Sequence, residues 1–517
     1  MGIKQNIRLW ENYVEYINED GVEVAVIAPR VWPQNPIKIV RMLSPRGFLF
    51  FLIGLLAWAC DGYDYNSVNL VATNLATVFD VDLTDITLSV TLTLIVRPFG
   101  AVIFGLLADM FGRKWVLSAN LWILAVLQIG TAYAPTFGVF VGVRTLFGCA
   151  MGGIWGMAAA LALENMPVEA RGLFSGILQN GYAMGYVLAA MVDIVGVPNT
   201  DLGYKVIFFA GAGFTGLMAI VILFIPESAI YAKEDLGADG FTTSVAAEGT
   251  DGMTTGINPR KRVSLFFRDA RLAARQYWKM FLFSVLFASV YNWETHACQD
   301  IFPSYLKVQK GFTARQASLA AILGQCGAII GGPLAGYYSQ FFGRRQTSIA
   351  CILIAWAFIP LFTLPTGYSA IMAGTFCLLT FVNASWGIMP ILLNEYSPPQ
   401  FRAVFPGTVY QLGNLISAPA AQSQTAAASR WIRNGLPNYS QVMTIFMCVV
   451  FFLAIVVCAL GPEKRGSHFE VIKRAGAMEN ILREEMREEK QLHLDADHVE
   501  DAETGLPRQQ AHAETVN

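Results

Sequence analysis

The sequence predicts an all-α membrane protein with about twelve transmembrane helices, arranged as two homologous six-helix bundles. Three observations support this prediction. Of the 517 residues, 54% are apolar and only 14% are charged, which is more apolar than soluble domains are. Apolar runs of roughly twenty residues recur along the chain, and this is the length that spans a bilayer as a helix. A motif from the first half of the chain also recurs in the second half.

The apolar runs form two sets of six candidate spans. The first set lies at 48–77, 85–108, 115–133, 137–161, 172–195 and 204–225. The second set lies at 278–305, 314–340, 347–365, 369–394, 403–428 and 440–461. We therefore expect bundles over 47–226 and 278–461, joined by a polar loop over 227–277 and flanked by polar or charged tails, 1–46 and 462–517.

An internal repeat relates the two sets. The segment Gly105–Lys114 recurs as Gly336–Arg345, 231 residues further along. The same offset relates two pairs of charged residues: Glu164 with Glu395, and Arg171 with Arg402. Transporter folds built from such repeats bind their substrate near the midplane, where the halves meet.

Lysine and arginine concentrate in one set of connections between the spans, including Arg113, the basic run 260–262 and Arg345. The positive-inside rule therefore places both termini and the central loop in the cytoplasm. The first long apolar run starts only near Phe48, so no signal peptide is indicated. The plasma membrane is the expected location.

Several classes of function are disfavoured. A net charge of −2 with no basic stripe argues against nucleic acid as a partner. The eight cysteines lie in apolar runs without paired metal spacing, as expected of packing residues. No nucleophile–base pair or metal set indicates an enzyme. We expect a monomer in the bilayer that has no cofactor other than protons as the coupling ion.

Charged residues at the cytoplasmic ends of the spans form a candidate gate: Asp109, Arg113, Glu164, Arg171, Arg344, Glu395 and Arg402. Opposite charges at the mouths of two bundles pair while the cytoplasmic side is closed, and they separate when it opens. The alternative interpretation is that these residues only mark the ends of helices. Their duplication in both halves favours gating.

Two motifs resemble those of the major facilitator superfamily. Gly105–Lys114 is similar to its loop motif, and Arg144–Gly153 is similar to its fourth-helix motif. The segment 226–228, Pro-Glu-Ser, ends the sixth span as in many members, whereas the Gly-Pro pair of the antiporter signature is missing from the fifth. The resemblance implies a transporter that works by alternating access.

Three polar residues of the first half lie deep in the spans. Arg144 is suited to anchor a carboxylate, because its planar guanidinium binds one through two parallel hydrogen bonds. Asp61 and Asp64 lie on one helix face. Two close carboxylates in hydrocarbon do not readily both stay ionised, which suits them to carry a proton. The alternatives are a structural ion pair with Arg144 and, for Asp64, a solvated position. Arg97 fits packing and function equally.

The seventh span carries a polar face formed by Asn292, His296, Gln299 and Asp300. These residues fall within a wedge of about 100° along roughly 12 Å of helix, and Glu294 points the other way. Charged groups in a span cost on the order of 2.5–3.5 kcal/mol each, so function is favoured over packing. His296 changes charge in the physiological pH range. The repeat aligns this face with Asp61, so we expect one shared cavity.

The same stretch resembles the signature of fungal lactate-type carboxylate permeases, which belong with the sialate:proton symporters. Matching positions are Asn292, Thr295, His296, Gln299 and Asp300, whereas Cys298 and Ser304 depart from the pattern. The resemblance implies that Arg144, Asn292, His296, Asp300 and a glutamine of the eleventh helix act in transport. Gln411 matches that glutamine.

These observations predict a proton-coupled symporter of small carboxylic acids, with lactate- or pyruvate-like monocarboxylates favoured. Substrate would bind Arg144, Asn292, His296, Gln299 and Gln411, and protons would be carried by Asp61, Asp64, His296 and Asp300. Carrying a bare monoanion against an inside-negative potential costs about 2.3 kcal/mol per 100 mV, and one proton removes this cost. Alternatives are a dicarboxylate or aromatic-acid:proton symporter, and a non-transporting nutrient sensor.

Overall fold

The computed structural model describes residues 13–17, 23–27, 31–81, 83–164, 166–225, 259–398 and 401–465. Before the bundle come β1 (Tyr13–Ile17), β2 (Glu23–Ile27) and α2 (Pro36–Met42). The N half contains α3 (Pro45–Leu70), α4 (Ala72–Phe79), α5 (Leu83–Phe111), α6 (Arg113–Ala132), α7 (Phe137–Gly152), α8 (Ile154–Glu164), α9 (Val168–Asn199) and α10 (Lys205–Leu223). The C half contains α12 (Pro259–Gln299), α13 (Phe302–Ser304), the π-helix η1 (Tyr305–Gln309), α14 (Ala314–Phe342), α15 (Arg344–Thr363), α16 (Tyr368–Trp386), α17 (Met389–Tyr396), α18 (Val404–Ser417), α19 (Ala420–Arg430), β3 (Ile432–Arg433), β4 (Leu436–Pro437) and α20 (Tyr439–Leu460).

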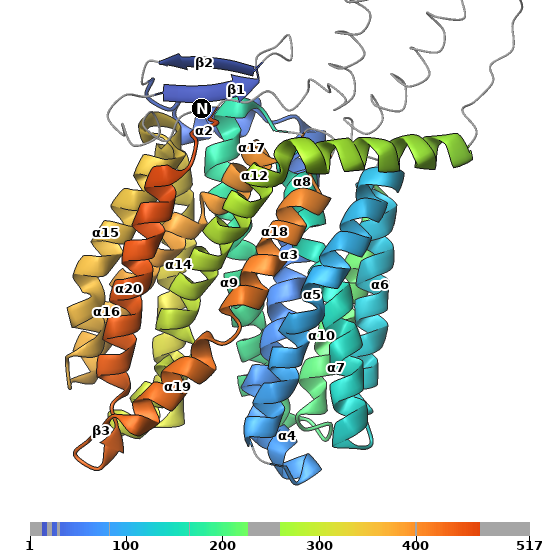
Figure 1. Cartoon of the computed structure of the whole chain (residues 1–517). Helices are drawn as coiled ribbons and strands as arrows, with labels where there is room; N and C mark the ends of the chain where they lie inside the picture. Colours follow the sequence, from blue (N-terminus) through green and yellow to red (C-terminus); the bar gives the residue numbers. More distant parts are fainter. Residues whose placement is uncertain are drawn as a thin grey trace, which may run out of the picture.

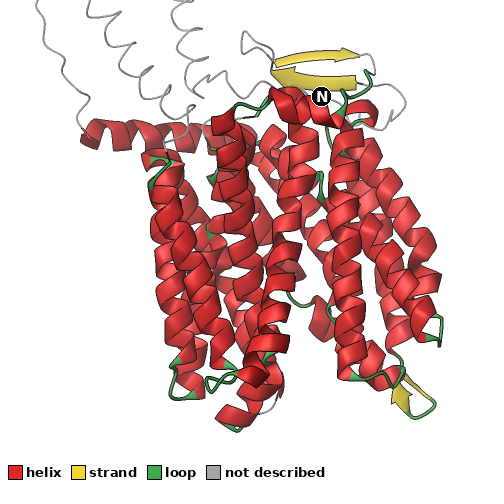
Figure 2. Ribbon diagram, turned by 180° about the vertical axis from the view of Figure 1, so that it is seen from behind, coloured by secondary structure: helices red, strands yellow, loops and turns green. Residues whose placement is uncertain are grey.

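Long helices run side by side through both halves (Figure 1). Among the described residues, ten helical stretches are long and apolar enough to cross a membrane. The second part of α12 and the broken pair α18–α19 run alongside them (Figure 1), and together they make the predicted twelve. These two are more polar because they carry Asn292–Asp300 and Gln411–Gln424. Seen from behind, the helices again fall into two groups (Figure 2).

The structure adds detail to three of the predicted segments. The tail 1–46 contains the antiparallel pair β1–β2 and the helix α2. The part of the predicted loop 227–277 from Pro259 onward is helical and belongs to α12. Its basic residues lower the hydropathy, so the sequence did not indicate a span there. Residues 461–465 return to the bundle, where Glu463 accepts hydrogen bonds from the backbone N–H groups of Arg344 and Arg345, both at 3.1 Å. The rest of the charged tail and the segment 226–228 lie outside the described residues.

The two halves repeat each other in detail. Gly112 and Gly343 both have a φ of 97°, a conformation that glycine adopts without steric cost, and each lies directly before a helix. The first residues of these helices form equivalent ion pairs. Arg113 Nη2 lies 3.0 Å from Glu164 Oε1, and Arg344 Nη2 lies 3.2 Å from Glu395 Oε1. The sequence repeat is therefore a structural repeat.

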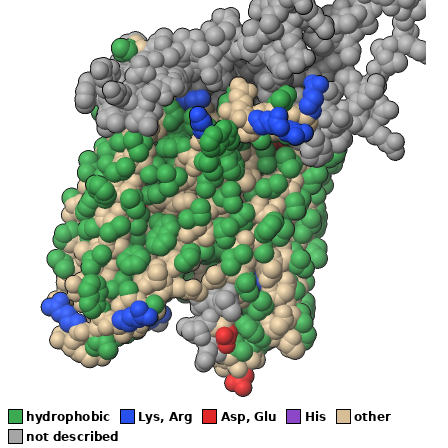
Figure 3. Space-filling view, in the orientation of Figure 1, with side chains coloured by type: hydrophobic (Ala, Val, Ile, Leu, Met, Phe, Trp, Pro, Cys, Tyr) green, Lys and Arg blue, Asp and Glu red, His purple; other side chains and the backbone are tan. Residues whose placement is uncertain are grey.

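The halves contact each other through α9 against α14 and α5 against α18. Glycines allow a close approach, since a Cβ at Gly172 or Gly176 would collide with the backbone of α14. We call the end of the bundle that carries α2 and the start of α12 the terminus side, and the end that carries α4 and β3 the far side (Figure 1). The surface is notched between the halves on the far side (Figure 3). On the terminus side the halves are in contact, because Asp109 of α5 accepts hydrogen bonds from Ala403 N and Val404 N at the start of α18.

Candidate functional site

Arg97 of α5 and Asp61 of α3 form a buried ion pair in the N half. Arg97 Nη2 lies 3.3 Å from Asp61 Oδ2 and 3.4 Å from Oδ1, and the two residues are 3% and 1% exposed. The guanidinium also lies over the ring of Tyr65, with Cζ 5.3 Å from the ring centroid. Arg97, for which the sequence favoured neither packing nor function, is therefore the direct partner of a predicted proton carrier.

Arg144 and Asp64 are connected through a third residue. Arg144 Nη1 donates to Gln128 Oε1 at 3.2 Å, and Gln128 Nε2 donates to Asp64 Oδ1 at 3.2 Å. Thr215 Oγ1 donates to the other oxygen of Asp64 at 3.1 Å. All four side chains are buried, so Asp64 is not solvated. A direct ion pair of Arg144 with Asp61 or Asp64 is absent among the described residues.

Gln128 and Thr215 were missed by sequence reasoning. Each is a single polar residue inside an apolar run, in α6 and α10 respectively. Such residues indicate a polar contact, but only the tertiary structure shows that both reach Asp64 of α3.

Small residues of α7 bring Arg144 close to Arg97. A Cβ at Gly148 would collide with the carbonyl of Thr93, and a Cβ at Gly152 would collide with the carbonyl of Arg97. The glycines that follow Arg144 thus let α7 pack directly on α5, which places two guanidinium groups in one buried region. Like charges this close require the nearby carboxylates.

Between these charges and the terminus side, aromatic rings of both halves pack together. Trp155 stacks on Tyr410 with ring centroids 4.6 Å apart. Trp58 meets Tyr410 edge-on at 6.1 Å, and Trp386 does so at 6.1 Å as well. Trp58 and Trp155 belong to the N half, whereas Tyr410 and Trp386 belong to the C half. This aromatic layer therefore fills the interface between the halves on the terminus side of the charged groups.

The polar face of α12 becomes more exposed along its length. Asn292 is 3% exposed, and its amide donates to the carbonyl of Ala288 at 2.8 Å. His296 and Asp300 have side chains that are 16% and 30% exposed, and His296 Nδ1 lies 2.9 Å from Asp300 Oδ2. Gln299 is half-buried. This face therefore runs from the buried middle of the protein to the notch on the far side.

The repeat relates the α12 face to the N-half charges. Tyr65 of α3 is the residue that the repeat aligns with His296. Tyr65 in turn lies against Arg97. The two predicted faces therefore lie on repeat-related helices, α3 and α12.

Two amides of the broken pair α18–α19 lie near this face. Gln411 is fully buried, and its Oε1 accepts from Asn414 at 3.1 Å. Its Nε2 has no hydrogen-bond partner within the described residues, which is uncommon for a buried donor. Gln424, which sequence reasoning missed, donates to the backbone carbonyl of His296 at 3.3 Å.

Glu294 points away from this face, as predicted. It is fully buried, and its two carboxylate oxygens lie 3.4 and 3.3 Å from the hydroxyl oxygen of Ser385 on α16, which also donates to Val382 O at 2.7 Å. The structure therefore supplies the partner that the sequence did not identify.

Ion pairs of the predicted gate are seen inside each half of the described chain. Arg113 joins Asp109 and Glu164, and Arg344 joins Glu395. The two remaining members, Arg171 and Arg402, are each 2% exposed.

Contact between the halves uses backbone groups. The carboxylate of Asp109 accepts from Ala403 N at 3.2 Å and Val404 N at 2.9 Å, at the start of α18. Its repeat equivalent Gln340 donates to Val168 O at 2.8 Å, at the start of α9. A helix N-terminus favours the carboxylate because its N–H groups are unpaired.

Residues 49–475 match the model of the sugar (and other) transporter family. The chain belongs to this family. It is 33% identical over 440 residues to the carboxylic acid transporter protein homolog of Saccharomyces cerevisiae, covering 83% of this chain and 70% of that protein. It is also 25% identical to the niacin transporter NiaP of Acinetobacter baylyi, covering 82% of this chain and 95% of the relative. A third relative, the cis,cis-muconate transport protein of the same organism, is 23% identical, with 74% and 87% covered.

The same fold occurs in a solved transporter. The proton:xylose symporter XylE of the major facilitator superfamily, bound to 6-bromo-6-deoxy-D-glucose, matches with a TM-score of 0.64 and 17% identity, covering 84% of this chain and 99% of the symporter. The protein is thus a multi-pass membrane transporter with the major facilitator fold, and it is not an enzyme.

Proposed function

We propose that this transporter is a proton-coupled symporter of small carboxylic acids that works by alternating access, with lactate- or pyruvate-like monocarboxylates favoured. The yeast relative is named for carboxylic acids, and the two bacterial relatives are named for niacin and muconate. A site that attracts carboxylates is common to these names.

The charge balance of the N-half cluster supports coupling to protons. Arg97 and Arg144 face Asp61 and Asp64, so the ionised cluster is neutral. An entering carboxylate would add one buried negative charge, and an uncompensated buried charge is costly. One accompanying proton on an aspartate restores neutrality. This balance is the observation on which the proposal rests.

Arg144 would hold the substrate carboxylate. Its guanidinium contacts a neutral amide, Gln128, and not an acid, so its capacity for a bidentate carboxylate contact is available. Arg97 is already paired with Asp61. A substrate that draws Arg144 toward itself would loosen the chain of contacts to Asp64 and let that aspartate take up or release its proton.

The C half would complete the site. Asn292, Gln299 and Gln411 would bind the hydroxyl or keto group of the substrate, and the free Nε2 of Gln411 is suited to such an acceptor. His296 and Asp300 would carry a proton, because their partial exposure gives them access to the far side.

The gate would act through the terminus side. Asp109, Arg113, Glu164, Arg171, Arg344, Glu395 and Arg402 would hold it closed in this conformation and release it in the opposite one. The terminus side would face the cytoplasm of a cell bounded by the plasma membrane, and the transporter would act as a monomer.

Uptake into proteoliposomes tests the proposal. Purified protein is reconstituted, a pH gradient is imposed, and labelled lactate uptake is measured against competing pyruvate, succinate, benzoate and xylose. We expect gradient-driven uptake that lactate and pyruvate inhibit most strongly. Strongest inhibition by succinate or benzoate would favour the dicarboxylate or aromatic-acid alternatives. Binding without uptake would favour the nutrient sensor, and uptake indifferent to the gradient would exclude symport.

A further inference from the structure

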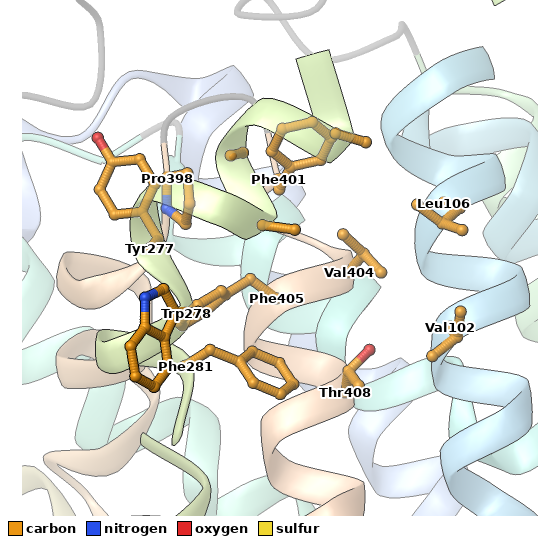
Figure 4. Close-up of a pocket in the computed structure, with 13 residues that line it drawn as sticks. Val102, Leu106, Tyr277, Trp278, Phe281, Pro398, Phe401, Val404, Phe405 and Thr408 are labelled. Carbon is orange, nitrogen blue, oxygen red and sulfur yellow. The ribbon is translucent and has the colours of Figure 1, made fainter. Parts of the chain in front are cut away.

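An apolar cavity lies apart from the candidate site, at the junction of α5, α12 and α18 on the terminus side. Its volume is about 310 Å³, at the lower end of the range of about 300–1,000 Å³ for ligand pockets. Val102 and Leu106 point from α5 toward Phe281 of α12 and Phe405 of α18 (Figure 4). The cavity is therefore walled by both halves.

The cavity reaches the membrane-facing surface. Val102 and Trp278, at its outer edge, are 38% and 51% exposed, whereas Phe405 and Thr408 are 7% and 8% exposed. A long, narrow apolar group could enter from the bilayer without crossing water. This geometry suits an acyl chain better than a polar solute.

The helix above the cavity is basic along one edge. The first part of α12 lies across the end of the bundle (Figure 1), and Lys and Arg side chains gather there (Figure 3). At 100° per residue, Arg271, Arg275 and Lys279 lie on the flank of the helix next to Trp278, and all three are exposed. An amphipathic helix with basic residues beside an apolar face binds anionic lipid at a membrane surface.

We propose that this cavity is a binding site for an anionic phospholipid of the terminus-side leaflet. One acyl chain would fill the cavity, and Arg271, Arg275 and Lys279 would hold the phosphate-bearing headgroup. The positive charges of these three side chains favour an anionic phospholipid over a neutral one.

Such a lipid would favour the conformation closed on the terminus side. The cavity is walled by Val404 of α18 as well as by α5, and Val404 N also donates to Asp109 of α5. If the halves separate there, the walls of the cavity part and its contacts with the acyl chain are lost. The inference does not depend on which substrate is transported.

Native mass spectrometry of the full chain in a mild detergent tests the site. Phosphatidylserine and phosphatidylcholine with identical acyl chains are titrated separately. We expect one phosphatidylserine to bind more tightly than any further copy and more tightly than phosphatidylcholine. Ala274→Trp, which fills the cavity, should abolish this tight site. Ala119→Trp, on an exposed position of α6, should retain it.

A charge variant tests the headgroup contact without changing the packing. R271Q/R275Q should weaken phosphatidylserine binding by about fivefold for each cation removed, whereas R430Q/R433Q, which removes two exposed cations of the far side, should not. Tight binding retained in Ala274→Trp would overturn the cavity assignment. Equal affinity for both lipids, or no effect of R271Q/R275Q, would overturn the selection for anionic headgroups.

Discussion

Arg144 and Asp64 are joined by the amide of one side chain, Gln128, instead of by a direct ion pair. Two hydrogen bonds of 3.2 Å complete this connection across α7, α6 and α3. A neutral bridge leaves both charged groups partly available to other partners. Gln128 therefore links a candidate substrate anchor with a candidate proton carrier, and neither charge is neutralised by the other in a direct ion pair.

Gln128→Leu removes this bridge. We expect KM for the substrate to rise about 10- to 100-fold, because a hydrogen bond to a charged group contributes about 1.5–3 kcal/mol. Asn120→Leu is the matched control. It removes another buried amide of α6, which donates to Ala150 O at 2.9 Å and touches no charged group. Concentration-dependent uptake should separate the variants, and an unchanged KM in Gln128→Leu would remove the bridge from the mechanism.

Arg144→Lys keeps the charge but removes the planar pair of donors. Uptake should fall at least about 100-fold if a bidentate carboxylate contact is lost, since charge-assisted pairs of this kind are the strong ones. Arg345→Lys serves as the control, because Arg345 Nε donates to the Cys458 carbonyl at 2.9 Å in α20. Near-normal affinity in Arg144→Lys would exclude Arg144 from the substrate site.

His296→Ala removes the 2.9 Å contact on α12, and Asp300→Asn removes the carboxylate charge from it. Each change should abolish pH-gradient-driven uptake while the protein still reaches the membrane, because one member of the proton pair is gone. Surface labelling measures delivery, and Asp201→Asn controls for the loss of an exposed carboxylate. Undiminished uptake in both variants would contradict the proposed proton path.

Asp109→Asn weakens the contact with the start of α18. We expect about 0.5–2 kcal/mol less stabilisation of the terminus-side closure, as for loss of a helix N-cap. Spin labels at the exposed far-side positions Val78 and Leu436, in a chain without its eight cysteines, should report more molecules closed on the far side. Asp80→Asn, an exposed change at the residue that follows α4, should leave the distance distribution unaltered. An unaltered distance distribution in Asp109→Asn would mean that the Asp109 carboxylate does not control closure of the terminus side.

Ser385→Ala removes the hydroxyl that Glu294 contacts. Leaving a buried carboxyl group without this donor should destabilise the protein by about 1–3 kcal/mol, seen as a lower Tm in detergent. Ser284→Ala, on α12 itself, removes a buried hydroxyl that has no hydrogen-bond partner in the described part of the chain, and it should change Tm little. Equal Tm losses in both variants would show that the Glu294–Ser385 contact contributes nothing specific.

The sequence by itself determined the features that depend on one helix or on the repeat. Apolar runs predicted the spans, since each must match the thickness of a bilayer. The 231-residue offset predicted that Arg113 and Glu164 would have counterparts in Arg344 and Glu395, and the structure pairs both sets alike. The polar face of α12 followed from helical periodicity alone. The helical start of α12 was not predicted, because its basic residues lower the hydropathy below that of a membrane span.

Only the tertiary structure decided which groups meet across helices. Arg97 pairs with Asp61, whereas Arg144 reaches Asp64 through Gln128. A hydropathy pattern shows only that a residue is polar within an apolar helix. Its partner depends on how closely the neighbouring helices pack, which the glycines of α7 decide here. The same holds for Asp109, whose partners are backbone N–H groups of α18 that no side-chain pattern reveals. Charge patterns predicted a gate at these positions, and packing decided that Arg113 pairs with Glu164 and Arg344 with Glu395.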